Sequence, residues 1–234
     1  MYSVGQSHIW LGAAIAVLTI GLVICIHAAE ERKWLRHMGW IALAAMTVQV
    51  LLGLRPLPQP PAIRIVHAFI GQLFFTLTGV IAVCTTAGWK RKPERAECAS
   101  WLWFLANCTP AMVLVQVALG TLFRHGALGV ALHLLGAFLV AMFISGLTLP
   151  VIYGPEDSAL RPAAQAFLAI ASVQVFLGLA LFTMSSMDID PQVMIVMTMI
   201  HAAMGALTLA ATVIMSLLIR RHIGVPERVH ESRE

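Results

Sequence analysis

Four histidines that stand in apolar segments are each followed, one helical turn later, by a glycine. These pairs are His8 with Gly12, His67 with Gly71, His133 with Gly136 and His201 with Gly205. An imidazole in hydrocarbon is costly unless it has a partner, and the iron of a haem takes one imidazole on each face. A glycine three or four residues further on lies on the same side of the helix and leaves room for a flat macrocycle. The pattern predicts two haem sites, with the first and second histidines as ligands of one iron and the third and fourth as ligands of the other.

The 234-residue chain is 59% hydrophobic and only 11% charged, with a mean hydropathy of +0.86. Soluble domains carry about 25% charged residues, so this composition predicts a membrane protein. The four cysteines have no metal-ligand spacing, and we expect free thiols. The absence of GxGxxG, Walker and HExxH motifs gives no support to a nucleotide-binding protein or a zinc hydrolase. The net charge of +4 arises in short loops and indicates no nucleic-acid partner.

Seven apolar stretches are each long enough to cross a bilayer, which takes about 20 residues of helix. The sequence therefore predicts an all-α fold, a polytopic membrane helical bundle of seven transmembrane helices surrounded by membrane lipid. The predicted spans are residues 8–29, 38–55, 64–87, 99–123, 126–153, 163–185 and 192–219.

The basic residues predict how these helices are oriented. Of the 15 Lys and Arg residues, only Arg55, Arg64 and Arg124 follow the even-numbered spans, and the other twelve lie in the remaining loops and the C-terminal tail. Cytoplasmic loops carry the excess of Lys and Arg. We therefore expect a protein of the cytoplasmic membrane with its N-terminus outside and its C-terminus in the cytoplasm. All four histidines of the His–Gly pairs then fall in the outer half of the membrane.

A glutamine followed four residues later by a glycine occurs on three of the other spans. These segments begin at Gln49, Gln116 and Gln174. Buried amides and small residues are common where membrane helices pack together, which is one interpretation of the motif. The glutamines also recur at the depth of the histidines, which favours the other interpretation, that they line a ligand pocket.

The order His, Gln, His occurs twice along the chain and indicates an internal repeat. We expect residues 1–87 to form a first haem-binding half of three helices and residues 99–219 a second half of four, related by pseudo-symmetry. Residues 88–98 are the expected basic cytoplasmic linker, and residues 220–234 the expected cytoplasmic tail. Repeats in membrane proteins commonly place a site in each half.

The segment Gln116-VALGTLFRHGALG resembles the haem A synthase family of cytochrome oxidase assembly, and Gln49-VLLG, Gln174-VFLG and His201-AAMGALTLA resemble its other helices. The similarity covers residues 8 to about 219, which correspond to the last seven of the family's eight helices. The resemblance implies that His8 and His67 hold the substrate haem. It implies that His133 and His201 hold a haem b, which passes electrons while a methyl group of haem O is oxidised to the formyl group of haem A.

The chain lacks the acidic residue that this family carries near its first histidine. In the family a glutamate stands three residues before the first histidine, where this chain has Gly5, and no Asp or Glu lies in any predicted span. The catalytic residues are therefore unknown. The outer arginines Arg55, Arg64 and Arg124 either contact the haem propionates or reach toward the membrane interface as solvated side chains.

A second function fits the same histidines. A diheme b-type membrane cytochrome, for example a quinol-linked subunit, carries electrons without modifying a haem and needs no catalytic acid, so Gly5 favours it. Other redox or oxidase-assembly subunits are the expected protein partners in both cases. A third alternative is a haem-free structural or assembly protein whose histidines form hydrogen bonds within the bundle.

Overall fold

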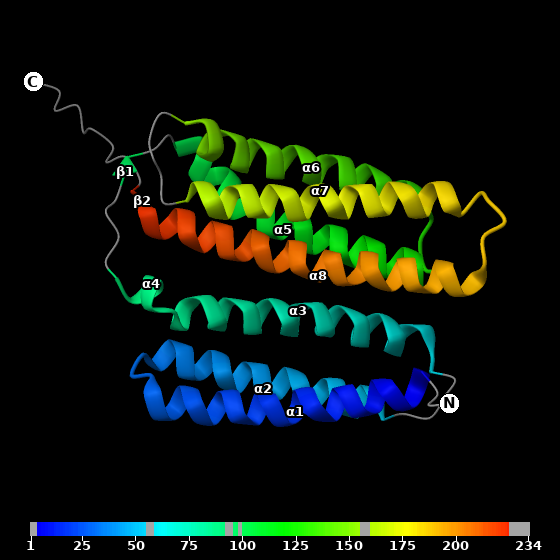
Figure 1. Cartoon of the computed structure of the whole chain (residues 1–234), viewed down its shortest axis with the longest axis horizontal. Helices are drawn as coiled ribbons and strands as arrows, with labels where there is room; N and C mark the ends of the chain where they lie inside the picture. Colours follow the sequence, from blue (N-terminus) through cyan, green and yellow to red (C-terminus); the bar gives the residue numbers. More distant parts are fainter. Residues whose placement is uncertain (1–3, 55–58, 92–95, 98–99, 155–159, 225–234) are drawn as a thin grey trace, which may run out of the picture.

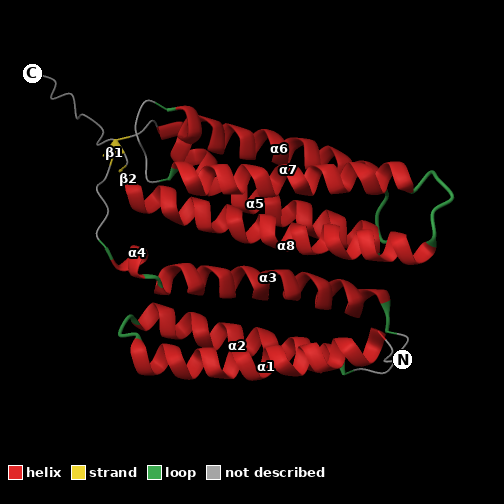
Figure 2. Ribbon diagram, viewed as in Figure 1, coloured by secondary structure: helices red, strands yellow, loops and turns green. Residues whose placement is uncertain are grey.

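The computed structural model describes residues 4–54, 59–91, 96–97, 100–154 and 160–224. Nearly all of these residues are helical (Figure 2). The seven long helices are α1 (Val4–Ala29), α2 (Lys33–Gly53), α3 (Pro61–Thr85), α5 (Ser100–Arg124), α6 (Val130–Tyr153), α7 (Arg161–Met184) and α8 (Pro191–His222). Between α3 and α5 lie a short helix, α4 (Ala87–Lys90), and a two-residue strand, β1 (Ala96–Glu97), which pairs in parallel with β2 (Ile223–Gly224).

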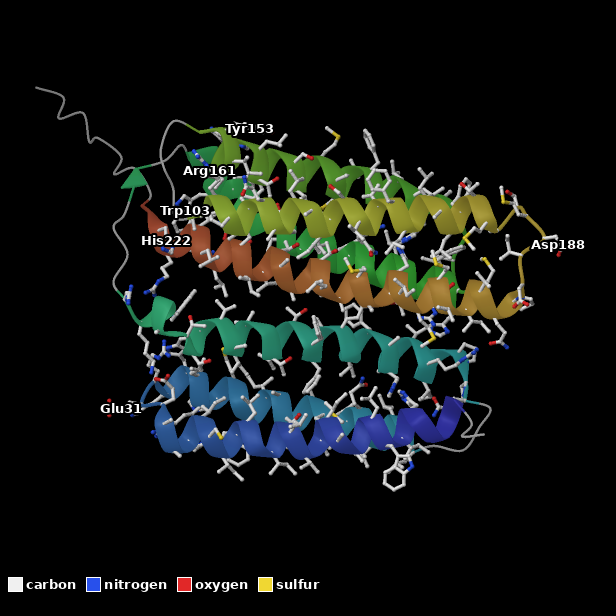
Figure 3. All side chains as sticks on the ribbon, viewed as in Figure 1. Glu31, Trp103, Tyr153, Arg161, Asp188 and His222 are labelled. Carbon is white, nitrogen blue, oxygen red and sulfur yellow. The ribbon has the colours of Figure 1, made fainter. Side chains whose placement is uncertain are left out.

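All seven long helices are apolar and long enough to cross a membrane. The shortest candidate span has 21 residues, and a helix of that length rises about 30 Å, the thickness of the hydrocarbon core. The predicted all-helical bundle and its seven spans are therefore confirmed. Charged side chains gather where the helices end. Figure 3 shows Glu31 and Arg161 at the end of the molecule where α8 stops, and Asp188 at the other end.

Several helix boundaries differ from the predicted ones by three to five residues, and those of α2 and α6 have a clear physical reason. Helix α2 begins at Lys33 and not at residue 38, because a helix can continue past the hydrocarbon with polar residues in its first turns. Helix α6 begins at Val130 and not at residue 126, because Gly126 adopts a left-handed φ of 74° that ends α5. The amide of Ala127 then donates to the carbonyl of Leu122, which is the closing bond of a Schellman turn.

The helices form two groups that meet along α3 and α8 (Figure 1). In the second group α5, α6, α7 and α8 form a closed ring, since each packs on the next and α8 returns to α5. Buried Leu147, Phe167 and Met215 fill its centre. In the first group α2 packs between α1 and α3. The groups join where Val80 and Cys84 of α3 pack against apolar side chains of α8.

The hydroxyl groups buried in the bundle are satisfied within their own helices. Thr109, Thr148 and Thr212 are fully buried, and each hydroxyl donates to the carbonyl four residues earlier at 2.7 or 2.8 Å. Of the cysteines, Cys25, Cys84 and Cys108 are free thiols, as predicted. The predictions for Cys98 and for Arg55 concern positions outside the described residues.

A partly buried ion pair fixes the turn between α1 and α2. Glu30 is 8% exposed, and its two carboxylate oxygens accept hydrogen bonds from Arg32 Nε at 2.7 Å and Arg32 Nη2 at 2.6 Å. The same guanidinium donates to the carbonyl of Cys84 at the end of α3. These hydrogen bonds hold the pKa of the Glu30 carboxyl at about 2. The turn is thereby linked to all three helices of the first group.

At the same end of the molecule, α8 is attached to the segment that follows α3. The Arg221 guanidinium lies over the ring of Trp89, 4.6 Å from its centroid. It also donates hydrogen bonds to the carbonyls of Trp89 and Arg91. The pairing of β1 with β2 adds a second link between the linker and the end of α8.

The Glu30 ion pair makes a prediction about stability and pH. At pH 7 we expect Glu30→Gln to lower the thermal unfolding temperature of the detergent-solubilised protein by a few degrees. The adjacent exposed Glu31→Gln should leave that temperature unchanged. Because the folded pKa lies near 2 and the usual value is 4.5, the stabilisation is fully present above the usual value and is lost as the pH falls toward the folded value. A difference between Glu30→Gln and the wild type that stays constant from pH 7 to pH 2 would contradict this role.

Candidate functional site

The structure brings the four histidines together as two pairs at one end of the bundle. The rings of His8 on α1 and His67 on α3 have centroids 5.9 Å apart and planes at 66°. The rings of His133 on α6 and His201 on α8 have centroids 6.4 Å apart and planes at 89°. The imidazoles of the second pair and that of His67 are half-buried, whereas His8 is exposed. Each group of helices therefore contains one pair.

Each of three helix pairs places a glycine of one helix under an imidazole of the next. An ideal Cβ built on Gly53 would lie 3.5 Å from Cε1 of His67. The corresponding distances are 2.8 Å from Gly120 to Cε1 of His133 and 3.1 Å from Gly178 to Cε1 of His201. The last two are shorter than an ordinary carbon–carbon contact, so only glycine fits there without displacing the ring.

The glutamines of the same helices occupy the space beside the glycine that follows each histidine. A Cβ on Gly71 would lie 2.9 Å from Nε2 of Gln49, and a Cβ on Gly205 would lie 3.4 Å from Nε2 of Gln174. A Cβ on Gly136 would overlap Oε1 of Gln116. The contact is thus reciprocal: the glycine of one helix receives the histidine, and the glycine of the other receives the glutamine. We call this arrangement the clasp, and it occurs between α2 and α3, α5 and α6, and α7 and α8.

Hydrogen bonds orient two of the clasped imidazoles. Nε2 of Gln116 donates to Nδ1 of His133 at 3.0 Å and to the His133 carbonyl at 2.9 Å. Nε2 of Gln174 lies 3.3 Å from Nε2 of His201. In the α5–α6 pair this leaves Nε2 of His133 as the ring nitrogen that the glutamine does not contact.

Several buried polar atoms around the histidines have no hydrogen-bond partner among the described residues. Buried donors and acceptors are normally paired, so a concentration of unpaired ones marks a place where a ligand would satisfy them. These atoms are His67 Nδ1, His201 Nδ1 and the Oε1 atoms of Gln49, Gln72, Gln116 and Gln174.

The sequence analysis did not include Gln72 among the site residues. Its Oε1 approaches the position of a Gly205 Cβ to 3.8 Å, beside the amide of Gln174. Gln72 belongs to α3 and Gly205 to α8, so this amide lies where the two groups meet. A lone glutamine in an apolar span is the only signal that the sequence carries for it, because Gln72 lacks the glycine four residues later.

Two of the predicted outer arginines lie near each other at the end of the bundle that holds the histidines. Arg64 lies in the first turn of α3 and Arg124 ends α5, and both side chains are exposed. Burial, and then the positive charges of Arg64 and Arg124, lower the pKa of the imidazole of His125, the residue that follows Arg124. Arg124 also lines a shallow pocket with Met194, Ile195 and Thr198 of α8. Arg55 lies outside the described residues.

Within the described part of the chain, no three His, Cys, Asp or Glu side chains gather in a way that could hold a metal ion. No Asp or Glu lies in any of the seven long helices, and position 5, in the first turns of α1, is a glycine. The site therefore offers paired imidazoles, amides and close approach to the helix backbones, and no carboxylates. Comparisons of the chain with protein-family models, curated proteins and solved structures give no match.

The clasp makes a prediction about packing. Gly120→Ala should destabilise the protein by about 1–3 kcal/mol, because the new methyl group presses on the imidazole ring of His133. Helix propensity alone would favour alanine by up to about 1 kcal/mol. The matched control is Gly21→Ala on α1, where a Cβ meets nothing within 4 Å. Chemical unfolding in detergent micelles measures both variants. Equal free energies of unfolding for Gly120→Ala and Gly21→Ala would contradict the requirement for glycine beside the His133 imidazole.

Proposed function

We propose that this chain binds two haems in the membrane, one between His8 and His67 and one between His133 and His201. The observation that carries the proposal is the separation of the rings within each pair. Two imidazoles that bind one metal ion through bonds of about 2 Å have ring centroids about 6 Å apart. The observed separations are 5.9 and 6.4 Å. The separation of the rings in each pair is therefore in the range that two imidazoles on one iron require.

The residues around the imidazoles suit a flat, largely apolar ligand. The glycines of the clasp let a macrocycle approach the helix backbones, and the unpaired amide oxygens offer acceptors at its edge. A glutamine that holds a ligating histidine by a hydrogen bond fixes the orientation of the ring, as partners behind metal-bound histidines commonly do. A bound haem would supply the redox chemistry, and these side chains would hold and orient it.

Two arginines at the histidine end of the bundle support the same ligand. Haem propionates need positively charged or hydrogen-bond-donating partners, and Arg64 and Arg124 lie at the helix ends beyond the histidines. We propose that these two arginines, together with the outer Arg55, contact the propionates. His125, located in the turn after α5, would serve as a neutral donor because its pKa is lowered.

We propose that the reaction is of the haem A synthase type. The first site would hold a haem O whose methyl group takes an oxygen atom from water and becomes a formyl group, and the four electrons released would leave through a haem b in the second site to an electron acceptor outside this chain. Support comes from the resemblance in sequence and from the arrangement of one histidine pair in each group. The competing proposal is a diheme cytochrome that transfers electrons only. The absence of Asp and Glu from all seven long helices favours it, because electron transfer needs no catalytic acid.

The two proposals predict different haem contents. We expect two haems per chain in the purified protein, and loss of one haem in His8→Ala and of the other in His133→Ala. His222→Ala, at the opposite end of α8, should keep both. Pigment extraction with mass analysis identifies each haem. Haem O or haem A lost only in His8→Ala supports the synthase, whereas haem b in both sites supports the electron carrier. A protein that takes up no haem would overturn both.

We further propose that the protein lies in the cytoplasmic membrane with its N-terminus outside. Among the described residues, Arg64 and Arg124 are the basic residues at the histidine end, and Arg32, Arg161 and Arg221 are among those at the other end. The positive-inside rule places the richer end in the cytoplasm.

Cysteine labelling tests this orientation. In a variant without the native cysteines, an impermeant maleimide added to intact cells should label Asp188→Cys. It should label Glu31→Cys only after the membrane is made permeable. These positions lie at opposite ends of the bundle (Figure 3). The reverse labelling pattern would place the N-terminus inside.

A further inference from the structure

One of the four His–Gly helices lacks the clasp that the other three have. His67, His133 and His201 each have a Gln–Gly helix beside them. His8 and Gly12 on α1 have the same spacing as His67 and Gly71, yet no atom of the described residues lies within 4 Å of a Cβ built on Gly12. The His8 side chain is exposed beyond its contact with the His67 ring. This polar face of α1 is open.

The second group of helices shows where the corresponding partner lies. There the histidine pair is carried by α6 and α8, and α7 packs between these two helices. Helix α5 closes the ring by packing on α6 and on α8. In the first group α2 packs between α1 and α3 in the same way. Within the described residues no helix beside α1 takes the place that α5 takes beside α6 (Figure 1).

Lipid covers an apolar helix face without cost, but it does not satisfy an imidazole. A polar side chain in hydrocarbon seeks another polar group. A glycine on the same face lets a neighbouring backbone come close, which is how membrane helices associate. His8 and Gly12 together therefore form a helix-binding face and not a lipid-facing one. A second copy of this chain cannot fill it with a free clasp helix, because all three Gln–Gly segments are engaged within their own molecule.

We propose that the His8–Gly12 face of α1 binds a transmembrane helix of another polypeptide, antiparallel to α1. That helix carries Gln or Asn, followed four residues later by Gly, Ala or Ser, so that its small residue lies under His8 and its amide fills the space at Gly12. The inference rests on helix packing and not on the proposed haem function. It makes the chain one component of a larger membrane complex.

A peptide of residues 100–124, which is α5 itself, serves as the probe because it carries the required motif. The full-length protein, labelled with a donor fluorophore at Asp188→Cys in a variant without native cysteines, is placed in phosphatidylcholine–phosphatidylglycerol vesicles with acceptor-labelled peptide. We expect saturable energy transfer. Gly12→Leu in the protein, or Gln116→Leu in the peptide, should weaken it about tenfold, as loss of an interhelical polar contact does.

Gly21→Leu is the matched control for Gly12→Leu. Gly21 lies nine residues further along α1 and hence on its opposite face, and it too has no neighbour within 4 Å of a built Cβ. Its binding curve should equal that of the wild type. Energy transfer that Gly12→Leu leaves unchanged, or that a scrambled peptide reproduces, would overturn the proposal. Analytical ultracentrifugation tests for a second copy on this face. A wild-type dimer that dissociates to monomers in Gly12→Leu would overturn the proposal and show that a second copy of the chain binds there.

Haem content measured on the same samples separates this inference from the proposed function. Peptide binding by a haem-free protein supports the docking face while it contradicts haem binding. A protein that contains two haems but does not bind the peptide supports haem binding and contradicts the docking face.

Discussion

The cost of placing imidazoles and amides in hydrocarbon is the constraint on which the rest of the structure depends. A helix surrounded by lipid satisfies its own backbone, so apolar side chains impose no particular arrangement of neighbours. Polar side chains do impose one. His133 receives two hydrogen-bonding contacts from Gln116, and the glycines beside them allow the two helices to come close enough for those contacts. The polar residues therefore determine which helices are neighbours and at what depth they meet.

The same constraint explains why the two ends of the bundle differ. Toward the end that holds the histidines, glutamine oxygens and histidine nitrogens remain unpaired, and the helices approach through glycine. Further along, buried Thr109, Thr148 and Thr212 bond to their own helices, and large apolar side chains such as Phe167 fill the ring. The molecule thus combines a half packed through large apolar side chains with a half in which helices meet through glycines and polar side chains.

Hydropathy alone predicted the seven spans, because a bilayer imposes one length on every crossing helix. Helical periodicity placed each glycine on the face of its histidine, and the repeat paired His8 with His67 and His133 with His201, which the structure brings together. Helical periodicity shows which residues share a face of one helix, but it does not show which other helix packs on that face. The reciprocal clasp, the amide of Gln72 between the groups and the Glu30–Arg32 pair could therefore not be derived from one sequence.

The position of α8 determines the order in which the molecule can assemble. This helix closes the ring of the second group and is also the surface against which α3 packs, yet it follows the other six long helices in the chain. Without α8, helices α5, α6 and α7 form an open arc, and α3 lacks the surface on which it packs. Contacts between residues so distant in sequence form late, since the intervening chain must be ordered first. Completion of the second histidine pair is thus linked to synthesis of α8, and a product that ends before α8 lacks His201.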